Sequence, residues 1–464
     1  MRPILPPGRA RPHVYDARQR DVEAFNYFTE RNLDAISQIH QLPADLRFDM
    51  QVVSSVLPFK VNSYVVDQLI DWSDIPDDPI FQLTFPQKGM LSEEHFERMA
   101  TLHRRAAPRA ELKEEANRIR LELNPHPAGQ TTLNVPRLDQ EPLPGLQHKY
   151  RETVLFFPTA GQTCHAYCTF CFRWAQFVGM SDLRFAAKEA TQLAEYVRRH
   201  PEVTNVLLTG GDPMVMKTHK LEQYVNPLLD PALEHLQTIR FGTKSVAYWP
   251  QRFVTDADAD DLLRLFDRII ESGRSVAVMA HYNHHREMET AIAREAVRRI
   301  RDTGAVIRSQ SPLLSHINDN AGVWELMWRE QVRLGIIPYY MFVERDTGAE
   351  EYFKIPLARA YKLFREAYRH VNGLARTVRG PSMSANPGKV EITGVTEVAG
   401  EKVFVLRFLQ GRNPDWVGRP FFARYDKEAS WMTHLRPAFG QEKFFFEEEL
   451  ERMTLKKEQE TRLE

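Results

Sequence analysis

The sequence predicts an α/β fold, a partial or full TIM-like (β/α) barrel of parallel strands with a helical N-terminal extension and a small C-terminal extension that contains strands. Three observations predict it. Short apolar runs alternate with segments of helical spacing between about residues 154 and 345. These runs are apolar on both faces, which is typical of parallel strands covered by helices. Each run leads into polar residues at the end where barrel enzymes carry their chemistry.

Six short runs rich in β-branched and aromatic residues predict the parallel strands. Polar residues follow them, such as "GGDP" after the second, "HYNHH" in the fourth and "VERD" after the sixth, and a parallel barrel would gather these ends on one face. The runs are "VLFFPTA" (154–160), "NVLLTGG" (205–211), "TIRFGT" (238–243), "SVAVMAHYN" (275–283), "AVIRSQS" (305–311) and "IIPYYMFVE" (336–344).

The segments between these runs have the spacing of amphipathic helices. In "TDADADDLLRLFDRIIESG" (255–273) the apolar residues recur at i, i+3, i+4 and i+7, an acidic or hydroxyl residue can cap the start, and Gly273 ends the pattern. The segments 287–304 and 323–335 have the same spacing and also end in glycine. The sequence therefore predicts helices that cover the strands.

The flanking regions differ from this repeating core. Residues 1–150 contain a basic, proline-rich arm followed by a mostly helical pattern, residues 151–375 form the predicted barrel, and residues 376–464 form the C-terminal extension. In the extension, "KVFVLRF" and "RPFFARYD" alternate like strands, and a charged tail predicts a solvated helix or frayed end. We expect three regions with these boundaries.

Composition excludes several classes of protein. The 464 residues have a formal net charge of −1 and are 43% hydrophobic, which is typical of a globular domain rather than a nucleic-acid-binding one. No apolar run approaches the roughly 18 residues of a membrane span, and the N-terminus lacks the apolar core of a secretory signal. We therefore expect no nucleic-acid or membrane partner, and a reducing, cytoplasmic location.

All three cysteines lie in "GQTCHAYCTFCFRWAQ", as Cys164, Cys168 and Cys171. Three buried small side chains would be scattered rather than clustered. Structural zinc takes four ligands, so a zinc site would need His165 or a distant histidine as well. Three thiolates can instead hold a [4Fe–4S] cluster with one iron open to another ligand. The spacing favours the cluster and leaves zinc as the alternative.

The segment "CHAYCTFCFR" resembles the signature of the radical S-adenosylmethionine (SAM) superfamily. The resemblance implies a [4Fe–4S] cluster whose open iron binds SAM, and reductive cleavage of SAM to a 5′-deoxyadenosyl radical. "TGGDP" after the second strand resembles the superfamily's glycine-rich SAM-binding segment. This implies that Gly210, Gly211 and Asp212 contribute to SAM binding, since glycines permit close approach of a ligand to the backbone.

Several further segments resemble the lysine 2,3-aminomutase family, over about residues 55–395. They are "PLPGLQHKYRETVLFF", "IRFGTKSVAYWPQR", "HYNH", "SQSPLLSHIND" and "IPYY", in the family's order. The resemblance implies a 2,3-aminomutase that moves the amino group of a free amino acid from C2 to C3. It also implies that Arg173 binds the α-carboxylate of the substrate, a task suited to a bidentate guanidinium.

The family also uses pyridoxal 5′-phosphate (PLP), bound as a Schiff base to a lysine that follows the barrel. "SANPGKVEI" places Lys389 at the matching position, so the resemblance implies that Lys389 is the catalytic, PLP-binding lysine. Without that context, a lysine after glycine would be interpreted as a solvated loop residue. Lys149, with Arg151 nearby, lies where the family carries a basic residue against the PLP phosphate, although the spacing to Cys164 is about two residues longer here.

Two positions depart from the lysine-specific enzymes, which bind the distant ammonium of lysine with two aspartates. The matching positions here are Arg345 and Ser382. An arginine repels an ammonium group and attracts a carboxylate, so these residues favour an acidic substrate such as glutamate or aspartate, as in the glutamate-type aminomutases, over lysine. A register shift of one residue would put Asp346 in the site instead, and Arg345 could simply pair with Glu344 or Asp346 on the surface.

The resemblance also bears on partners. Lysine-specific members carry C-terminal cysteines that bind zinc and link subunits, and this chain has none, so any homo-oligomer must form without that tether. A reducing protein of the flavodoxin or ferredoxin type would supply the electron. The alternatives to an acidic-substrate aminomutase are a lysine 2,3-aminomutase, a PLP-independent radical SAM enzyme or protein-lysine-modifying relative, and a non-catalytic metal-cluster protein.

Overall fold

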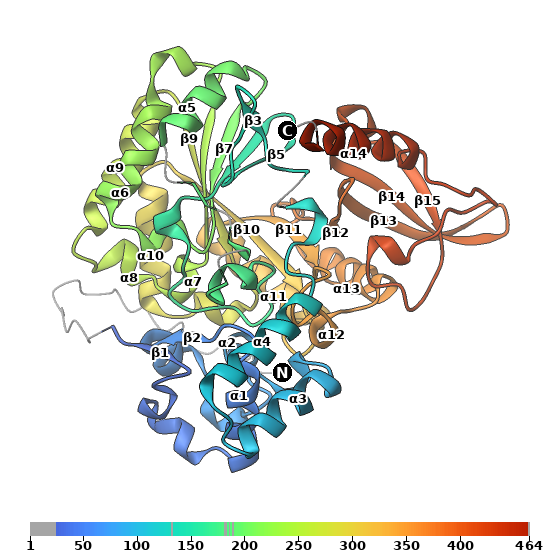
Figure 1. The fold of residues 1–464 in the computed structure, drawn as a ribbon. Coiled ribbons are helices and arrows are strands. Elements are labelled where there is room, and N and C mark those ends of the chain that lie inside the picture. Colours follow the sequence, from blue (N-terminus) through green and yellow to red (C-terminus); the bar gives the residue numbers. More distant parts are fainter. Residues whose placement is uncertain (1–24, 131–132, 181–182, 185, 188–189, 463–464) are drawn as a thin grey trace, which may run out of the picture.

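The structure is a computed structural model, and it describes residues 25–130, 133–180, 183–184, 186–187 and 190–462. Its centre is a sheet of eleven strands in the order β15-β14-β13-β12-β11-β10-β9-β8-β7-β6-β5 (Figure 1). The strands from β6 to β12 are all parallel, and helices cover them. The parallel strands are β6 (Thr153–Phe156), β7 (Asn205–Leu208), β8 (Thr238–Thr243), β9 (Ser275–His281), β10 (Val306–Leu313), β11 (Ile337–Val343) and β12 (Arg379–Ser384).

The prediction of a parallel α/β architecture is confirmed. All six expected strands form, in chain order and side by side, as β6 to β11. The sheet is a partial barrel, because its first and last strands do not pair with each other. The seventh parallel strand, β12, was missed. Its sequence "RGPSMS" contains Gly380, Pro381 and two serines, which are typical of a loop, yet the residues from Gly380 to Met383 are buried.

The connecting helices also form as expected. Three of them end where the sequence places a glycine, and Gly273, Gly304 and Gly335 all have the positive φ that favours glycine after a helix. The helices around the barrel are α5 (Ala190–Arg199), α6 (Thr218–Val225), α7 (Ser245–Tyr248), α8 (Gln251–Val254), α9 (Ala259–Glu271), α10 (Ala291–Asp302), α11 (Ala321–Leu334), α12 (Glu350–Phe353) and α13 (Leu357–Arg369).

The N-terminal extension is mainly helical and lies below the barrel in Figure 1. It holds the cysteine-bearing loop from outside: the Tyr167 N–H donates to the Lys60 carbonyl at 2.8 Å, and the Thr169 N–H donates to the Leu83 carbonyl at 3.0 Å. The extension therefore fixes the backbone between the cysteines. Its elements are β1 (Tyr27–Thr29), α1 (Ala44–Ser54), β2 (Lys60–Asn62), α2 (Pro79–Thr84), α3 (Glu93–Arg104) and α4 (Arg109–Glu122), and the short strands β3 (Arg137–Leu138), β4 (Glu141–Pro142) and β5 (Leu146–Tyr150) lead into the barrel.

The C-terminal extension continues the same sheet with antiparallel strands. Both strands predicted there form, as β14 (Glu401–Gly411) and β15 (Pro420–Arg424), and β13 (Gly388–Val398) was not predicted. A second hydrophobic core lies beneath them, built largely from aromatic side chains such as Phe404, Phe408 and Trp416. The tail forms a helix, α14 (Glu447–Arg462). The end of β14 lies against β5, so this extension covers the open side of the partial barrel.

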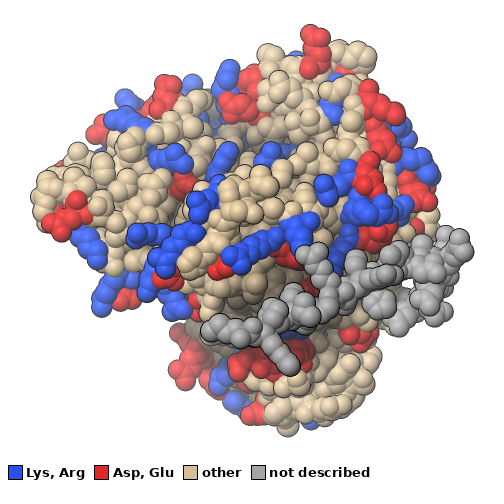
Figure 2. Space-filling model, turned by 180° about the vertical axis from the view of Figure 1, so that it is seen from behind, with Lys and Arg blue, Asp and Glu red and all other residues tan. Residues whose placement is uncertain are grey.

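The surface agrees with the near-neutral charge of the chain. Seen from behind, acidic and basic side chains are interspersed over most of the visible face (Figure 2). Among the residues that the structure describes, no helix combines the length and apolar character needed to cross a bilayer.

Candidate active site

Two adjoining cavities lie inside the partial barrel, one at the carboxyl ends of the parallel strands and one lined by residues further back along them. The cysteine cavity has a volume of about 280 Å³, and all three cysteines line it. The lysine cavity has a volume of about 200 Å³, and Lys149 and Lys389 line it. The two cavities share wall residues, so a ligand in one can contact a ligand in the other. The shared residues are Phe172, Arg173, Leu207, Gln310, Arg345 and Ser384.

The three thiols lie in the loop between β6 and the first covering helix, and each is partly exposed to the cysteine cavity. Burial raises the pKa of Cys171 to about 11 and raises the pKa of Cys164 and Cys168 further. Free thiols with such pKa values are protonated and unreactive at neutral pH, whereas a bound metal deprotonates its thiol ligands. The donor set therefore suits a metal centre better than a free nucleophile.

Among the described residues, no group of three or more histidine, cysteine or acidic side chains is arranged to hold a single metal ion. Each thiolate of a [4Fe–4S] cluster binds a different iron, so cluster ligands need not converge in this way. His165 lines neither cavity. Its Nδ1 atom lies 2.7 Å from the Tyr27 hydroxyl, and its ring packs on Trp249. The residues present thus fit a cluster held by three thiolates.

Gly210 and Gly211 let the end of β7 pack directly on the segment before the first cysteine. A Cβ atom at Gly211 would lie 2.3 Å from the Thr163 carbonyl oxygen, and one at Gly210 would lie 2.2 Å from the Gln162 side chain. Both glycines line the cysteine cavity. Their lack of side chains is therefore needed for chain packing, and their contact with SAM stays a prediction.

Asp212 ties the ends of two neighbouring strands together. Its buried carboxylate accepts hydrogen bonds from the Thr243 hydroxyl at 2.7 Å, the Lys244 N–H at 2.9 Å and the Ser245 hydroxyl at 3.0 Å, besides the Met214 N–H. These donors hold the β7 and β8 ends in register at the cavity. Asp212 lines the cysteine cavity, but its oxygens are already engaged by the protein.

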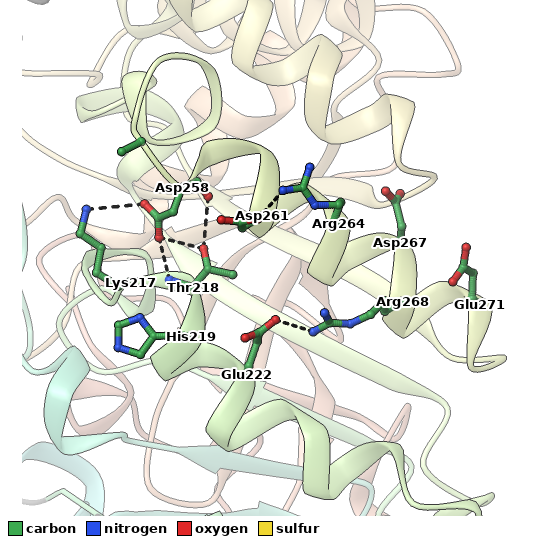
Figure 3. A pocket seen from close by; sticks show the side chains of 11 residues that line it. Lys217, Thr218, His219, Glu222, Asp258, Asp261, Arg264, Asp267, Arg268 and Glu271 are labelled. Atoms are coloured by element: carbon green, nitrogen blue, oxygen red, sulfur yellow. Dashed lines mark hydrogen bonds and ion pairs between the residues drawn. The ribbon is translucent and has the colours of Figure 1, made fainter.

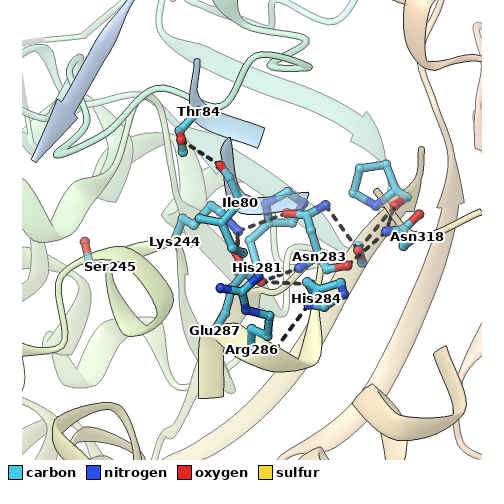
Figure 4. A network of polar contacts seen from close by, with 12 residues as sticks. Ile80, Thr84, Lys244, Ser245, His281, Asn283, His284, Arg286, Glu287 and Asn318 are labelled. Atoms are coloured by element: carbon cyan, nitrogen blue, oxygen red, sulfur yellow. Dashed lines mark hydrogen bonds and ion pairs between the residues drawn. The ribbon is translucent and has the colours of Figure 1, made fainter. Parts of the chain in front are cut away.

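A buried polar network forms another part of the cysteine cavity wall (Figure 4). The Lys244 ammonium donates to Glu287 at 2.6 Å, to the Asn283 side chain at 2.9 Å and to the His281 carbonyl at 3.2 Å. Glu287 in turn accepts from two backbone N–H groups of the "HYNHH" segment. This network explains why polar residues follow the fourth predicted strand, and it places a positive charge beside the thiols.

Lys389 lies in the lysine cavity opposite Gln410, its partner across the β13–β14 ladder. The Lys389 amine donates to the Gln410 side-chain oxygen at 3.1 Å and lies 3.9 Å from the centroid of the Tyr340 ring. Burial, with the nearby guanidinium groups of Arg240 and Arg379, lowers the pKa of Lys389 to about 7. A lysine partly neutral at physiological pH can attack a carbonyl group, as binding of PLP requires.

Lys149 projects from β5 into the same cavity, and Arg151 does not. The Lys149 ammonium donates to the Ala385 carbonyl. Burial and the neighbouring Arg412, Arg345 and Lys389 lower the pKa of Lys149 well below its usual value. Arg151 is exposed. Lys149, rather than Arg151, is thus placed to meet a ligand of the lysine cavity.

Arg173 and Arg345 line both cavities, on the wall between them. Arg173 donates to the Gly210 carbonyl at 3.3 Å. Burial and the Arg345 charge lower the pKa of Arg173 to about 10. Within the described part of the chain, Nε and Nη2 of Arg345 are buried without a hydrogen-bond partner. Burial lowers the pKa of Arg345, while the nearby Asp346 and Glu344 carboxyl groups favour its charged form. Arg345 is therefore buried between the cavities rather than paired on the surface, with these carboxyl groups close by.

Ser382 is not brought to either cavity. It is fully buried within β12, and its hydroxyl lies 3.4 Å from the Met341 carbonyl. Ser384, two residues nearer the carboxyl end of the strand, lines both cavities. Residues two apart share a face of a strand but differ in depth by roughly 6.6 Å. The substrate contact predicted for Ser382 finds no support, and Ser384 occupies that place in the wall.

Comparison with known proteins identifies the family. No family model matches the chain. A protein of Aquifex aeolicus (strain VF5) named "Putative L-lysine 2,3-aminomutase" is 31% identical over 393 residues, which cover 85% of this chain and 91% of that protein. The chain belongs to the lysine 2,3-aminomutase family. The L-lysine 2,3-aminomutase of Fusobacterium nucleatum is 28% identical over 51% of this chain and 52% of its own, and that of Bacillus subtilis is 27% identical over 51% and 47%.

Solved structures add little. A radical SAM methyltransferase from Sphaerobacter thermophilus covers 50% of this chain and 68% of its own, at 17% identity and a TM-score of 0.36, and a similarity this weak bears on neither fold nor function. Membership of the lysine 2,3-aminomutase family makes the protein a radical SAM isomerase. It also implies a [4Fe–4S] cluster and SAM, for which the cysteine cavity has suitable residues.

Another hollow of this lysine 2,3-aminomutase family member lies on the surface between α6 and α9 (Figure 3). Its charged side chains pair with one another: Arg268 contacts Glu222 at 2.7 Å, and Lys217 contacts Asp258 at 3.5 Å. None of the predicted site residues lines it. It is a solvated groove between helices on the outside of the barrel.

Sequence reasoning missed several residues of the site. No local sequence pattern links Lys244 to the "HYNHH" motif that it contacts in the structure. Tyr150 lies beside Lys149 in the family-like lead-in, and adjacency could have found it. Gln410 and Arg412 lie in a hairpin that the sequence did not place near the barrel. The missed wall residues include Tyr150, Arg240, Lys244, Gln310, Tyr340, Glu344 and Gln410.

Proposed function

We propose that this protein is a radical SAM, PLP-dependent 2,3-aminomutase that moves the α-amino group of a free acidic amino acid, glutamate or aspartate, to C3. The observation that carries the proposal is the position of Arg345. Its guanidinium lies on the wall between the two cavities with buried donors that have no partner among the described residues. Unpartnered buried donors are costly, and a substrate carboxylate would supply the missing acceptor.

A second arginine in the same wall supports a substrate with two carboxylates. Burial and, to a smaller extent, the Arg345 charge lower the pKa of Arg173, so a carboxylate beside Arg173 would stabilise its charged form. An α-carboxylate on Arg173 and a side-chain carboxylate on Arg345 would neutralise both. A lysine substrate would bring only one carboxylate and would add an ammonium group beside a cation.

The remaining side chains have roles that follow from their positions. The cluster and SAM supply the adenosyl radical, and PLP supplies the carrier for the migrating amino group. Cys164, Cys168 and Cys171 would hold the cluster, and Lys389, with its pKa near 7, would hold PLP covalently. The two arginines orient the substrate between the cavities. The rings of Phe157, Phe172 and Tyr340 line the lysine cavity and limit access of water to a reactive radical.

Lysine is the second candidate substrate, because the relatives are named as L-lysine 2,3-aminomutases. Glu344 also lines the cysteine cavity and carries a carboxyl group. Burial raises its pKa well above the usual value, however, which disfavours the charged form that an ammonium group would pair with. An acidic amino acid is therefore favoured over lysine as the substrate.

The test is an anaerobic assay of the reconstituted enzyme with dithionite, SAM and PLP against a panel of α-amino acids. Formation of β-glutamate from glutamate, or amino-group migration detected with isotopically labelled aspartate, supports the proposal. Turnover of lysine, with none of glutamate or aspartate, overturns the acidic substrate. Formation of 5′-deoxyadenosine without any dependence on PLP would favour the PLP-independent or protein-modifying alternatives. No 5′-deoxyadenosine, with Cys168→Ala behaving like wild type, would favour a non-catalytic cluster.

A further inference from the structure

Three basic side chains gather around one short segment of the C-terminal extension. Lys149 donates to the carbonyl of Ala385, and Arg412 donates through Nε to the carbonyl of Asn386 at 2.8 Å. Lys389 follows three residues later. Lys149 comes from β5, before the barrel, whereas Lys389 lies in β13 and Arg412 directly follows β14. The fold, rather than the local sequence, brings them together.

Arg412 directly follows β14 and contacts a residue that lines the lysine cavity. Its Nη2 atom donates to the Asn134 side chain at 2.7 Å and to the Asn386 side chain at 3.0 Å. Asn134 is buried and lines the lysine cavity. Within the part of the chain that the structure describes, Nη1 of Arg412 has no hydrogen-bond partner, so these contacts aim the guanidinium and leave two of its donors free.

The surroundings of Lys149 and Arg412 contain amides rather than carboxylates. Gln130, Asn134 and Gln147 line this part of the lysine cavity, and no acidic side chain lines it among the described residues. The Arg412 charge contributes to the lowered pKa of Lys149, so the two cations repel one another. An anion between them would turn that repulsion into attraction, and amide N–H groups can donate further hydrogen bonds to its oxygens.

We propose that Arg412 joins Lys149, which the family resemblance already places against the PLP phosphate, in binding that phosphate, so that the C-terminal hairpin completes the cofactor site. The inference deepens the proposed function and rests on it. Gln410, two residues before Arg412, holds the Lys389 amine that would bond the aldehyde carbon. The aldehyde and phosphate arms are attached to neighbouring ring carbons of PLP, so their partners must also be neighbours. The end of β14 would therefore position both the aldehyde arm and the phosphate arm of PLP.

The experiment compares PLP with pyridoxal, which lacks the phosphate. Binding of each to the full-length protein is followed by the visible absorption of the lysine-bound cofactor. In Arg412→Gln the dissociation constant for PLP should rise at least tenfold, whereas that for pyridoxal should change less than twofold. Arg412→Lys, which keeps the charge, should recover part of the PLP affinity. Arg419→Ala removes an exposed arginine of the same hairpin, and it should match wild type.

The outcomes separate the inference from the proposed function. A wild-type protein that forms no lysine-bound species with PLP or pyridoxal overturns the PLP dependence itself, and the inference with it. A wild type that binds PLP, with Arg412→Gln binding it equally well, overturns only the inference. Equal weakening of PLP binding and pyridoxal binding in both Arg412 variants would also overturn the inference. That result would show that Arg412 has a structural role and no preference for the phosphate.

Discussion

Arg173 and Arg345 lie against the same aromatic ring: the central guanidinium carbon of each is 5.0 Å from the centroid of the Phe172 ring. Phe172 directly follows the last cysteine, so two cations flank a residue tied to the cluster loop. A guanidinium on an aromatic face is attracted to the ring and loses conformational freedom. This arrangement holds two carboxylate-binding groups at the boundary between the two cavities.

Arg345→Asp is expected to reverse the preference for substrate charge. A hydrogen bond to a charged group contributes about 1.5–3 kcal/mol, so kcat/KM for the acidic substrate should fall about 10- to 150-fold. Steady-state kinetics on glutamate, aspartate and lysine would measure the change. Arg345→Lys keeps the charge and should lose less. An acidic substrate turned over equally well by Arg345→Asp would show that Arg345 does not contact it.

The capture of PLP should depend on pH with a midpoint near 7. Burial lowers the pKa of Lys389 to about 7, so below this pH the amine is protonated and cannot attack, and above it the amine is neutral. The capture rate, followed by visible absorption, should therefore rise with pH through about 7. Lys389→Ala should show no lysine-bound species. A midpoint that stays near the ordinary lysine pKa, roughly 10.4, would contradict this environment.

Gln410→Glu should move that midpoint upward. It places a carboxylate where the amide oxygen now lies, 3.1 Å from the Lys389 amine, and a negative neighbour stabilises the ammonium form. A shift of one pKa unit or more is expected, which lowers the neutral fraction of Lys389 at pH 7, and with it the rate of PLP capture, at least about fivefold. Arg407 lies on the same hairpin and pairs with the buried Glu391, so Arg407→Lys, which keeps that charge, serves as the control. An unchanged midpoint in Gln410→Glu would show that Gln410 does not contact the amine in solution.

Replacing any one cysteine with alanine should abolish cluster assembly. The chain has no other thiol to substitute, so Cys164→Ala, Cys168→Ala and Cys171→Ala should each lose bound iron, the visible cluster absorption and formation of 5′-deoxyadenosine. His165→Gln should retain its iron, since His165 lines neither cavity. Loss of metal in His165→Gln with unchanged folding would instead support a fourth protein ligand.

Gly211→Ala should disturb the cysteine loop without touching a thiol. The added methyl group would lie 2.3 Å from the Thr163 carbonyl oxygen, and overpacking of this kind costs about 1–3 kcal/mol in the free energy of unfolding. Denaturant unfolding of the apoprotein and the yield of reconstituted cluster should both fall. Gly373→Ala, where the methyl group would meet no atom within 4 Å, is the matched control. Equal stability of the two variants would contradict the close packing at Gly211.

Much of the barrel and part of the site could be predicted from local pattern. The six apolar runs correspond to β6 to β11. They could be predicted because a strand buried on both faces shows as a short apolar run in the sequence. Strand β12 was missed because its serines and proline resemble a loop, and only its neighbours bury it. The cysteine cluster was evident because three ligands on one loop need no long-range contact to be close together.

How deep a residue lies along its strand cannot be predicted from such local patterns. Ser382 and Ser384 share a face, but one lies inside the packed sheet and the other reaches the cavities. Ser382 was chosen by its match to the family. Whether a serine of β12 reaches the cavities instead depends on how far along the strand it lies. His165 shows the converse: it lies between two cysteines in the sequence, yet its ring turns toward Tyr27 and Trp249.

The amino-acid sequence was sufficient to predict the parallel α/β core and to locate the thiol triplet and Arg345. Periodicity and motif spacing are local properties of the chain, so they can be recognised in the sequence alone. The tertiary structure decided which residues share a cavity. Lys149, Arg412 and Lys389 meet because β5 and the C-terminal hairpin approach each other across the open side of the barrel. That approach depends on strand order and packing over the whole chain, which no short window of sequence contains.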